Sequence, residues 1–525
     1  MLLYSPKAPI VKNPIFLYQF STKSYFYRIR GVSTILSLMN YCSRKILVLL
    51  CCSVWLFSAA QNDSASLKRY NDSITALVQA IIKKSNDTAI VAIADITITG
   101  NKKTKPYIIE REIPFKQGDY IKRGDLEKQL ITARQLIINT ALFTDVEVYI
   151  QNITGELVFI NVDVKERWYL FPLPYFKLVD RNFNQWWVEQ KASLSRVNYG
   201  IKFMQNNVSG RNDKLGINLI TGYSRQVQIK YEQPYATPSL KSGFSVAFNF
   251  SRQRELNYKT ELSKQAFYKQ DQFVMQNIRG EIAYLYRPAI KVRHVFKFAY
   301  TYNSIDDTII KQNPNYFPNG KTSIKYPEVS YSIQYFNTDY NAYPSRGILA
   351  EGSVIRKGFF NNDINVTQLQ ALASYAVPVK KKMVLTLQGA GIIKVPFNQP
   401  YYNQQLFGYG LAYLRGLEYY VTDGVAGILA RTTLRRQVLD FALKSPPGSK
   451  KQVTIPFKVF LKAGADIGYT YNRDPGNSLL SNKFLYTECV GADIVIVPYD
   501  LIFKFEYSFN QLGEQGLFFH VRTDF

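Results

Sequence analysis

Arg415 is the residue whose setting most strongly suggests a specific chemical role. It lies in LFGYGLAYLRGLEYY (residues 406–420), a stretch rich in glycine and aromatic residues that has the period of neither a helix nor a plain strand. A guanidinium held by a carboxylate in a partly dry cavity can bind it through two hydrogen bonds, and such a pair is much stronger than one at the surface. The alternative is an ordinary loop or rim arginine, because exposed charges are the common case.

Side chains that could perform catalysis are few. His294 and His520 are the only histidines; His294 alternates in phase with aromatic residues, and His520 shares the polar face of the last predicted strand with Asp524, without a nucleophile. The glycine pair in GAGIIK (residues 389–394) lies in an apparent strand and lacks the strand–turn–helix of a phosphate site. Three of the four cysteines precede residue 60, which argues against a disulfide framework or a thiolate metal cluster. The sequence therefore predicts no enzymatic activity, no cofactor and no metal.

The bulk composition favours a membrane setting over nucleic acid. The chain has 525 residues and a formal charge of +26, which is compatible with nucleic acid, an anionic membrane surface or a water-filled basic cavity. Aromatic residues make up 15% of the chain, and tyrosine and phenylalanine at this level suit sheets and membrane interfaces better than a basic nucleic-acid groove. We therefore expect no nucleic-acid partner.

Residues 1–60 have the layout of a secretory signal peptide. A basic start precedes an apolar run (residues 46–57), and small residues follow before the polar sequence begins. The apolar run is shorter than the ~20 residues of a spanning helix. Residues 1–38 contain no carboxylate, and we interpret Met39 as the true start, with a real N-terminal extension as the alternative. The chain is expected to be exported, with residues 61–92 as a linker that holds a short amphipathic helix.

Residues 93–167 carry a compact mixed pattern. ITITGN predicts a strand and a turn, TKPYIIEREI predicts a helix with Thr104 as its N-cap, and LEKQLITARQLII predicts a second helix. FTDVEVYI and ELVFINVDVKER alternate with period two and predict two strands. The order strand, helix, helix, strand, strand predicts one small α+β domain.

The period changes to two over residues 168–525. Apolar and polar residues alternate in GFSVAFNFS, EVSYSIQYF and DLIFKFEYSF, and turn clusters such as NPNYFPNGK separate these segments. A soluble β-sandwich would alternate as well, but one of this length would usually divide into several domains with linkers. We predict a mostly β chain with an antiparallel transmembrane β-barrel of about 16 strands, whose apolar positions face lipid and whose polar positions face a wet lumen.

The first of these units closely resembles a POTRA domain. The resemblance lies in ITITGNKKTKPYIIEREIPFKQGD, LEKQLITARQLIINTALFTDVEV and VDVKERW, which follow one another over the whole segment. POTRA domains are periplasmic modules that bind partner chains, often by adding a strand to an open sheet edge, and they precede outer-membrane barrels. A POTRA-like domain followed by a barrel resembles the BamA/TamA family and its two-partner-secretion relatives.

Further motifs support this resemblance in the right order. NNVSGRND resembles the turn between the first two barrel strands, DYNAYPSRG has the Asp-to-Pro-to-Gly spacing of the family, and YLRGLEYY resembles the tip of a long loop that folds back into the lumen. LKAGADIGYTY resembles the barrel strand with the acidic partner of that loop, and the last strand resembles the C-terminal barrel signal. The residues that match are Asn207, Gly210, Asp339, Pro344, Gly347, Leu414, Arg415, Gly416, Asp466, Gly468, Phe519, Val521 and Phe525.

The resemblance implies a role in handling polypeptides. Arg415 would pair with Asp466 inside the barrel, although Leu417 stands where the family usually has an aromatic residue. The protein would lie in the bacterial outer membrane, receive unfolded outer-membrane or secreted polypeptides at a periplasmic POTRA domain, and insert or translocate them. The alternatives are a two-partner-secretion pore that exports one dedicated protein, and a channel whose POTRA domain is a tether. The lipid bilayer, with or without lipopolysaccharide, and accessory periplasmic or lipoprotein partners complete the implied contacts.

Overall fold

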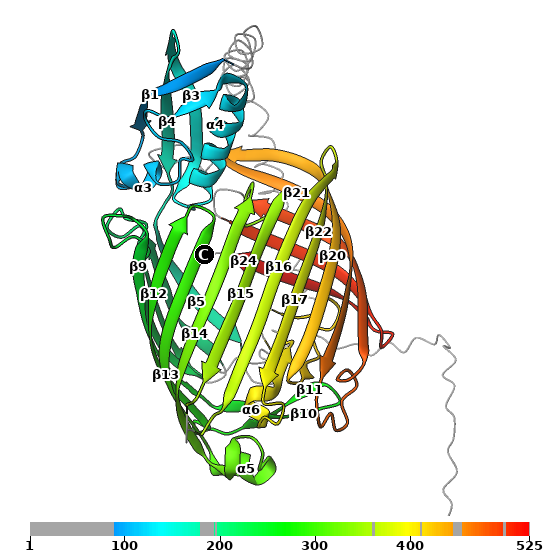
Figure 1. Ribbon diagram of the computed structural model, residues 1–525. Helices are drawn as coiled ribbons and strands as arrows, with labels where there is room; N and C mark the ends of the chain where they lie inside the picture. Colours follow the sequence, from blue (N-terminus) through cyan, green and yellow to red (C-terminus); the bar gives the residue numbers. More distant parts are fainter. Residues whose placement is uncertain are drawn as a thin grey trace, which may run out of the picture. The chain divides into compact units, whose positions relative to one another are not determined.

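The computed structural model describes residues 89–178, 194, 197–359, 363–409, 412–444, 454–496 and 500–523. The predicted signal peptide (residues 1–60), most of the predicted linker (residues 61–92) and Phe525 lie outside the described residues. Two structured regions follow one another along the chain, a small α+β region and a large antiparallel sheet (Figure 1).

The α+β region is a four-stranded sheet with two helices. Its elements are β1 (Ile90–Thr99), α3 (Pro106–Glu110), β2 (Tyr120–Lys122), α4 (Arg123–Ile138), β3 (Phe143–Thr154) and β4 (Leu157–Glu166). The strand order is β2-β1-β4-β3, with β1 parallel to β4 and the other pairs antiparallel. One core of aliphatic residues joins the sheet to both helices, among them Ile93, Ile109, Leu126, Ile137 and Val162. The predicted order of helices and longer strands is confirmed, and the three-residue strand β2 is an addition.

The predicted cap of α3 was wrong. Lys105, rather than Thr104, occupies the N-cap position, and its side chain makes no capping hydrogen bond. The Thr104 hydroxyl instead bonds the Tyr169 hydroxyl at 3.0 Å and accepts from Asn207 Nδ2 at 2.9 Å. Pro106 sits at the start of the helix, where its missing N–H costs nothing.

The large sheet has sixteen strands in which neighbours along the sheet follow the chain order. They are β5 (Leu170–Leu178), β6 (Val197–Asn206), β7 (Lys214–Gly222), β8 (Arg225–Gln233), β9 (Ser242–Gln253), β12 (Met275–Ala289), β13 (Val292–Ile305), β14 (Ser323–Thr338), β15 (Gly347–Lys357), β16 (Val366–Lys380), β17 (Met383–Val395), β20 (Ala426–Lys444), β21 (Thr454–Tyr471), β22 (Phe484–Ile496), β23 (Leu501–Asn510) and β24 (Gln515–Thr523).

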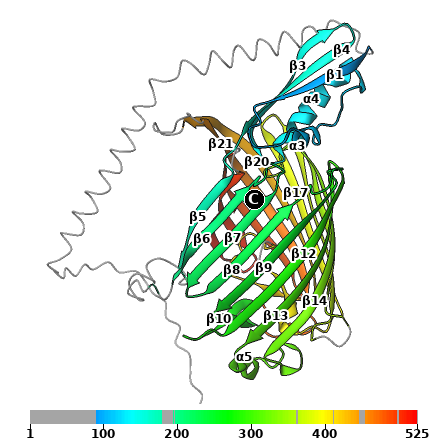
Figure 2. The ribbon, with the colours of Figure 1, turned by 90° about the vertical axis from the view of Figure 1, so that its left-hand side faces the viewer.

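The sheet curls into the shape of a barrel (Figures 1 and 2). The predicted mostly β fold with about sixteen antiparallel strands is confirmed. Among the residues that the structure describes, no backbone pairing joins β5 to β24, so the sheet keeps two edges. Within the same residues, no helix has both the length and the apolarity to cross a membrane.

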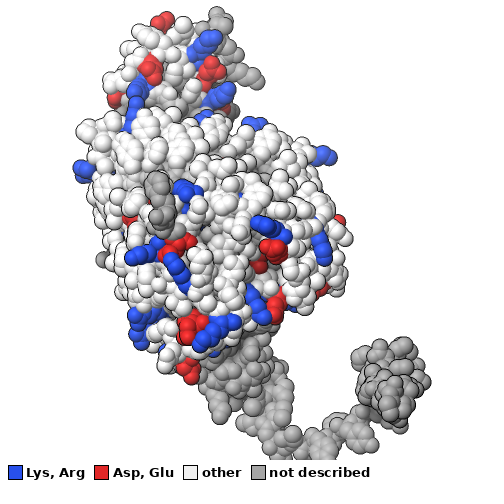
Figure 3. Space-filling model, turned by 60° about the horizontal axis from the view of Figure 1, so that its bottom comes forward, with Lys and Arg blue, Asp and Glu red and all other residues white. Residues whose placement is uncertain are grey.

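The alternation of side chains separates an outer face from an inner face. On β13, Phe296, Phe298 and Tyr300 are about half exposed on the outside, whereas Ala299 and Thr301 are buried inside. Charged side chains gather at the end of the sheet that Figure 3 brings forward, and the flank beside them is mostly uncharged. This arrangement is the apolar-out, polar-in pattern of a barrel in lipid.

One end of the barrel, termed here the loop end, is built from short elements between the strands. They are the hairpin β10 (Glu255–Glu261) and β11 (Lys264–Lys269), α5 (Asp307–Gln312), η3 (Pro318–Gly320), α6 (Tyr401–Gln404), β18 (Gln405–Phe407) and β19 (Thr422–Asp423). A cluster of buried aromatic and aliphatic residues around Tyr316, Phe317 and Tyr401 packs several of these elements together.

Candidate functional site

Arg415 lies inside the barrel, on the long connection between β17 and β20 (residues 396–425, here the luminal loop). Its side chain is only 3% exposed, and the carboxylate of Asp466 on β21 is fully buried. Nε of Arg415 donates to the two Asp466 oxygens at 3.0 and 3.2 Å, Nη2 also donates to this carboxylate, and the Arg415 backbone N–H adds a bond of 2.9 Å. The structure therefore brings the two residues together through both side chain and backbone.

Further contacts complete the surroundings of this pair. Arg415 Nη1 donates to Thr433 Oγ1, and Nη2 donates to the Thr432 carbonyl, each at 3.1 Å. Arg431 on β20 donates from Nε to Asp466 at 3.1 Å and from Nη2 to the Tyr413 carbonyl at 2.7 Å. Two guanidinium groups thus share one carboxylate, and the loop backbone is held on either side of Arg415. Satisfying most of the polar groups is what makes a buried charge pair tolerable.

Three glycines provide the room that this contact needs. Gly416 has φ +88°, a conformation that other residues rarely adopt. A Cβ atom at Gly464 would lie 2.7 Å from Arg415 Nη2, so the guanidinium occupies the space above this glycine. A Cβ atom at Gly468 would lie 3.4 Å from the Leu414 side chain. The loop tip therefore packs directly on the backbone of β21.

Apolar contacts reinforce the polar anchor. Leu414 and Leu417 are buried, and they pack in one cluster with Phe407, Tyr420, Leu429, Leu480 and Leu485. Leu417, which departs from the aromatic residue usual in the family, thus fills a buried site of the luminal loop. On the other side of the tip, Asn510 Nδ2 donates to the Gly416 carbonyl at 2.7 Å.

A row of charged residues continues from this anchor across the inner wall to the last strand. Lys462 on β21 contacts Asp493 on β22 and Glu506 on β23, with nitrogen–oxygen distances of 2.5 and 2.7 Å. Glu506 lies 3.9 Å from Arg415 Nη1 and 3.6 Å from His520 Nε2 on β24. The Arg415 anchor is therefore electrostatically connected to the edge strand β24.

The Asp339 motif forms the turn between β14 and β15. Asp339 Oδ1 accepts backbone N–H groups of Tyr340, Ser345 and Arg346, and Gly347 has φ +111°. The Pro344 carbonyl accepts a bond from Arg435 on β20. Side chains of this turn enter the barrel: Tyr343 stacks beneath the Arg435 guanidinium and donates to Asp493 at 2.7 Å.

The Asn207 motif lies where the barrel meets the α+β region. It connects β6 and β7, so the prediction that it follows the first barrel strand was wrong by one strand. Asn207 donates to Thr104, and the Gly210 carbonyl accepts from the Lys105 N–H at 3.0 Å. Burial raises the pKa of Tyr169, which bonds Thr104, to about 12, and this hydroxyl therefore remains protonated at neutral pH.

The prediction placed the Asn207 turn one strand too early because the first barrel strand, β5, has an unusual sequence. It reads LFPLPYFKL, and its two prolines argue against an interior strand. In the structure β5 is an edge strand that pairs only with β6 among the described residues, and an edge tolerates proline because one side of its backbone needs no donors.

A buried ion pair joins the α+β region to the barrel, and sequence reasoning missed it. Glu112, 2% exposed, accepts from Arg287 at the end of β12 at 2.5 and 2.8 Å, and from Arg111 at 2.9 Å. A second contact lies at the end of α4, where Asn139 bonds the β14–β15 turn through the Thr338 carbonyl and the Asn341 N–H. These contacts link residues far apart in the sequence, so no local pattern predicts them. The only local signal is that apolar residues directly follow Glu112 in the sequence.

The residues of the C-terminal signal lie on the outer face of β24. Phe519 and Val521 are 55% and 50% exposed, and Phe519 packs against Phe505 at a ring distance of 4.9 Å. Phe525 lies outside the described residues.

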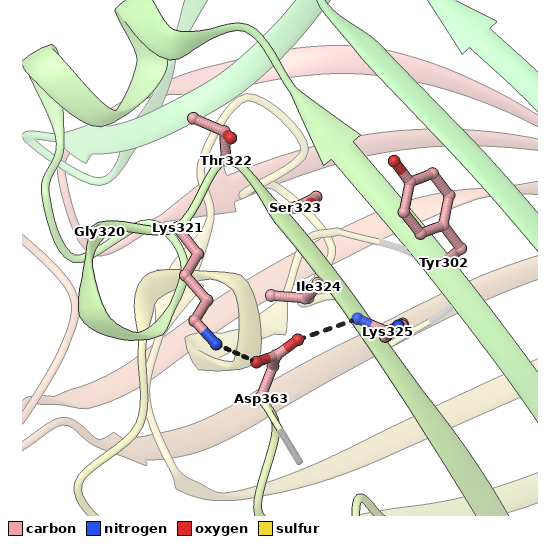
Figure 4. Close-up of a pocket in the computed structure, with 8 residues that line it drawn as sticks. All are labelled: Tyr302, Gly320, Lys321, Thr322, Ser323, Ile324, Lys325 and Asp363. Atoms are coloured by element: carbon pink, nitrogen blue, oxygen red, sulfur yellow. Dashed lines mark hydrogen bonds and ion pairs between the residues drawn. The ribbon is translucent and has the colours of Figure 1, made fainter.

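A further polar site is a small pocket at the loop end, and an ion pair of the protein itself occupies it. Asp363 contacts Lys321 and accepts the Lys325 N–H at 3.2 Å (Figure 4).

Arg431, Lys462, Glu506 and Gly464 were also missed from the sequence. The first three occupy inward positions of their strands, where Arg431 contacts Asp466 and Lys462 contacts Glu506, and the alternation of β20, β21 and β23 contains this signal. Their mutual distances, however, depend on strand register, which no local pattern supplies.

Two family models match the sequence in regions that agree with this architecture. A family model described as the Omp85 superfamily domain matches residues 207–418, and a POTRA model, described as the surface antigen variable number repeat, matches residues 91–167. No curated protein matches the sequence. Solved structures that resemble the chain include BamA from Haemophilus ducreyi lacking POTRA domains 1–3, with 16% identity and a TM-score of 0.45 over 82% of this chain and 84% of that one.

Two CdiB structures also resemble the chain. CdiB from Escherichia coli has 10% identity and a TM-score of 0.49 over 82% of this chain and 75% of that one. CdiB from Acinetobacter baumannii has 12% identity and a TM-score of 0.46 over 82% and 73%.

The fold is that of a β-barrel protein with an internal loop. A sixteen-stranded antiparallel barrel follows a small α+β domain, and a buried Arg–Asp pair holds the loop inside the barrel. The two matched ranges together cover more than half of the sequence. The chain belongs to the Omp85 superfamily and carries a POTRA domain at residues 91–167. Proteins of this family are outer-membrane barrels with periplasmic POTRA domains, and they act as transporters or assembly factors on polypeptides rather than as enzymes.

Proposed function

We propose that this protein lies in a bacterial outer membrane and inserts or translocates polypeptides that its POTRA domain receives in the periplasm. The observation that carries the proposal is the presence in one chain of a POTRA domain and an Omp85 domain. The protein acts without catalysis, cofactor or metal. Residues 1–60 would direct export, and residues 61–92 would link the signal to the POTRA domain at residues 93–167.

The outer face of the barrel supports the membrane location. Half-exposed aromatic and aliphatic residues project from successive strands, as on β13, while buried polar side chains lie within. In water these apolar side chains would be costly, since burial of an aromatic or aliphatic side chain is worth about 1.5–3 kcal/mol. A lipid bilayer removes this cost and leaves the polar lumen hydrated.

The POTRA sheet offers two edges for an incoming chain. Strand order β2-β1-β4-β3 leaves β2 and the twelve-residue β3 at the edges. An unfolded segment can pair with the free backbone groups of an edge strand, which gives affinity with little sequence preference. This property suits a protein that handles many polypeptides.

The luminal loop acts in this proposal as a two-position element. Its docked position is held by the Arg415–Asp466 pair, and the charged row through Lys462 and Glu506 connects this pair to β24. Release of Arg415 would clear the lumen and alter the charges that face the edge strand. Leu414, Gly416 and Gly468 would shape the docked position, and the turns at Asn207, Gly210, Asp339, Pro344 and Gly347 would hold the barrel against the POTRA domain.

Depletion of the protein, with the outer-membrane proteins read by quantitative mass spectrometry, tests the proposal. We expect a broad loss of barrel proteins. Loss of one surface or secreted protein alone would instead assign the protein as a dedicated two-partner-secretion pore. An unchanged protein composition would contradict the proposal, and unchanged growth after deletion of the POTRA domain would favour a channel with a tether.

A further inference from the structure

The hairpin β20–β21 extends beyond both of its neighbours in the sheet. Among the described residues, β17 pairs with β20 only as far as Arg436, and β22 pairs with β21 only from Phe457 onward. Residues 438–444 of β20 continue to pair with β21 up to Lys444, opposite Thr454. We call residues 438–444 of β20, with their partners 454–459 on β21, the overhang; residues 457–459 still pair with β22, whereas no described strand pairs with residues 438–444 on the β17 side. Figure 2 shows the end of this hairpin projecting past the adjoining strands.

The overhang has one apolar face and one polar face. Leu439, Phe441 and Leu443 are 56%, 43% and 43% exposed, and they lie opposite Val459, Phe457 and Ile455. The rings of Phe441 and Phe457 stack in parallel at 5.4 Å. On the other face, Asp440 lies opposite Lys458 and accepts from Gln437 at 2.9 Å.

The apolar face of the overhang continues the outer face of the barrel. Leu461 is 54% exposed on the outside, while Phe460 is buried inside against Tyr343. Val459 and Phe457 follow Leu461 at alternate positions and therefore share its outward face. Cross-strand pairing places Leu439 and Phe441 on this same face.

The overhang also has a free backbone edge. Beyond Arg436 the adjacent strand β17 has ended, and among the described residues the last backbone hydrogen bond on this side runs from the Gln437 N–H to the Lys382 carbonyl. The described residues of β20 after Gln437 thus present backbone groups without a neighbouring strand on that side. A long apolar edge of this kind is one that proteins normally shield, because it pairs readily with other strands.

The edge begins at the barrel end that contacts the POTRA domain. Just before the overhang, Arg435 bonds the Pro344 carbonyl, and Tyr343 packs on Phe460. The same β14–β15 turn bonds Asn139 at the end of α4. A chain that leaves the POTRA domain is therefore close to the overhang.

We propose that the overhang binds an extended segment of a client polypeptide by strand addition to the free edge of β20. A lipid surface would cover the apolar face but leave the backbone edge unpaired, at a cost of several kcal/mol per group in an apolar setting. An extended chain satisfies both requirements if apolar residues alternate with polar ones, which is the pattern of a barrel strand. This inference rests on the proposed function and specifies a client surface other than the POTRA edges.

The test introduces a photo-crosslinking residue at Leu439 in the full-length protein in cells, with the same residue at Lys311, an exposed position of α5 at the loop end, as the background site. We expect light-dependent adducts with several outer-membrane polypeptides at Leu439. Adducts with lipid only, or with a second copy of this protein only, would overturn the proposal.

Matched variants test the role of the apolar face. Phe441→Asp should lower the Leu439 adducts about tenfold, given the burial energy of such a side chain. Ala442→Asp, which adds the same charge on the opposite face, should change them less than about twofold. Equal adduct yields in the two variants would contradict strand addition. Heat-modifiable mobility shows whether each variant barrel folds. The crosslinking experiment at Leu439 uses the otherwise unaltered protein, so it tests the proposal even if a variant fails to fold.

The outcome separates this inference from the proposed function. If depletion lowers the amounts of barrel proteins but Leu439 gives no polypeptide adducts, the overhang proposal alone fails. If depletion changes no outer-membrane or secreted protein, the proposed function fails whatever the overhang binds.

Discussion

The substitution Gly464→Ala perturbs the luminal anchor without removing any charged group. A Cβ atom at this position would lie 2.5 Å from the Thr432 carbonyl and 2.7 Å from Arg415 Nη2. The first contact is with backbone, which cannot rotate away, and the second is with the guanidinium itself. We therefore expect Arg415 to be displaced from Asp466.

The magnitude follows from two opposing effects. Loss of one partner of a buried ion pair costs about 3–5 kcal/mol. Alanine is favoured over glycine in a strand by roughly 0.5–1 kcal/mol, because glycine loses more conformational freedom on folding. The expected net loss is about 2–4 kcal/mol in the free energy of unfolding.

Urea denaturation of the purified protein in detergent micelles, followed by heat-modifiable mobility, measures this loss. Gly391→Ala on β17 is the matched control, since a Cβ atom there would meet nothing within 4 Å. The control should change the free energy of unfolding by about 1 kcal/mol or less. If Gly464→Ala unfolds at the same urea concentration as the control, the guanidinium does not depend on the space above Gly464 and the reasoning is refuted.

Three other predictions concern the anchor, the POTRA contact and the outer face. Arg415→Ala and Asp466→Ala should each impair assembly of client proteins, and the exchange of the two charges should restore part of it; full activity of both single variants, measured by the amounts of clients in the outer membrane, would refute the pairing. Glu112→Ala leaves Arg287 buried without its carboxylate, which costs about 3–5 kcal/mol, and hydrogen exchange of the POTRA domain should increase; unchanged exchange would show that the contact contributes little. Cysteines placed singly at the outward positions of β23, which are Leu501, Phe503 and Phe505, should resist water-soluble maleimide in membranes. Asp474→Cys in an exposed loop should react and serves as the control. Labelling at all four positions would contradict the orientation of β23.

Local sequence patterns account for much of the barrel. Period-two alternation predicts strands such as β14 and β23, because each has one face against lipid and one against the lumen. The pattern failed at β5, where two prolines hide an edge strand. It also contains no sign that β20 and β21 outgrow their neighbours, since strand length relative to adjacent strands depends on the register of the whole sheet.

The candidate site was accessible from sequence in part. Arg415 and Asp466 were paired through their resemblance to a family motif, whereas their spacing in the chain gives no distance. Arg431 and Lys462 could not be assigned to the same site, because any inward arginine or lysine has the same local pattern. The space above Gly464 emerges only when the loop and β21 are seen together.

Reconstitution in liposomes directly measures whether this protein inserts polypeptides into a membrane. The purified protein would be placed in liposomes, a urea-denatured barrel polypeptide added, and its insertion followed by the appearance of heat-modifiable mobility. We expect faster insertion than in empty liposomes, and a smaller acceleration with the Asp466→Ala variant. Insertion at the same rate in liposomes with and without the protein would contradict it.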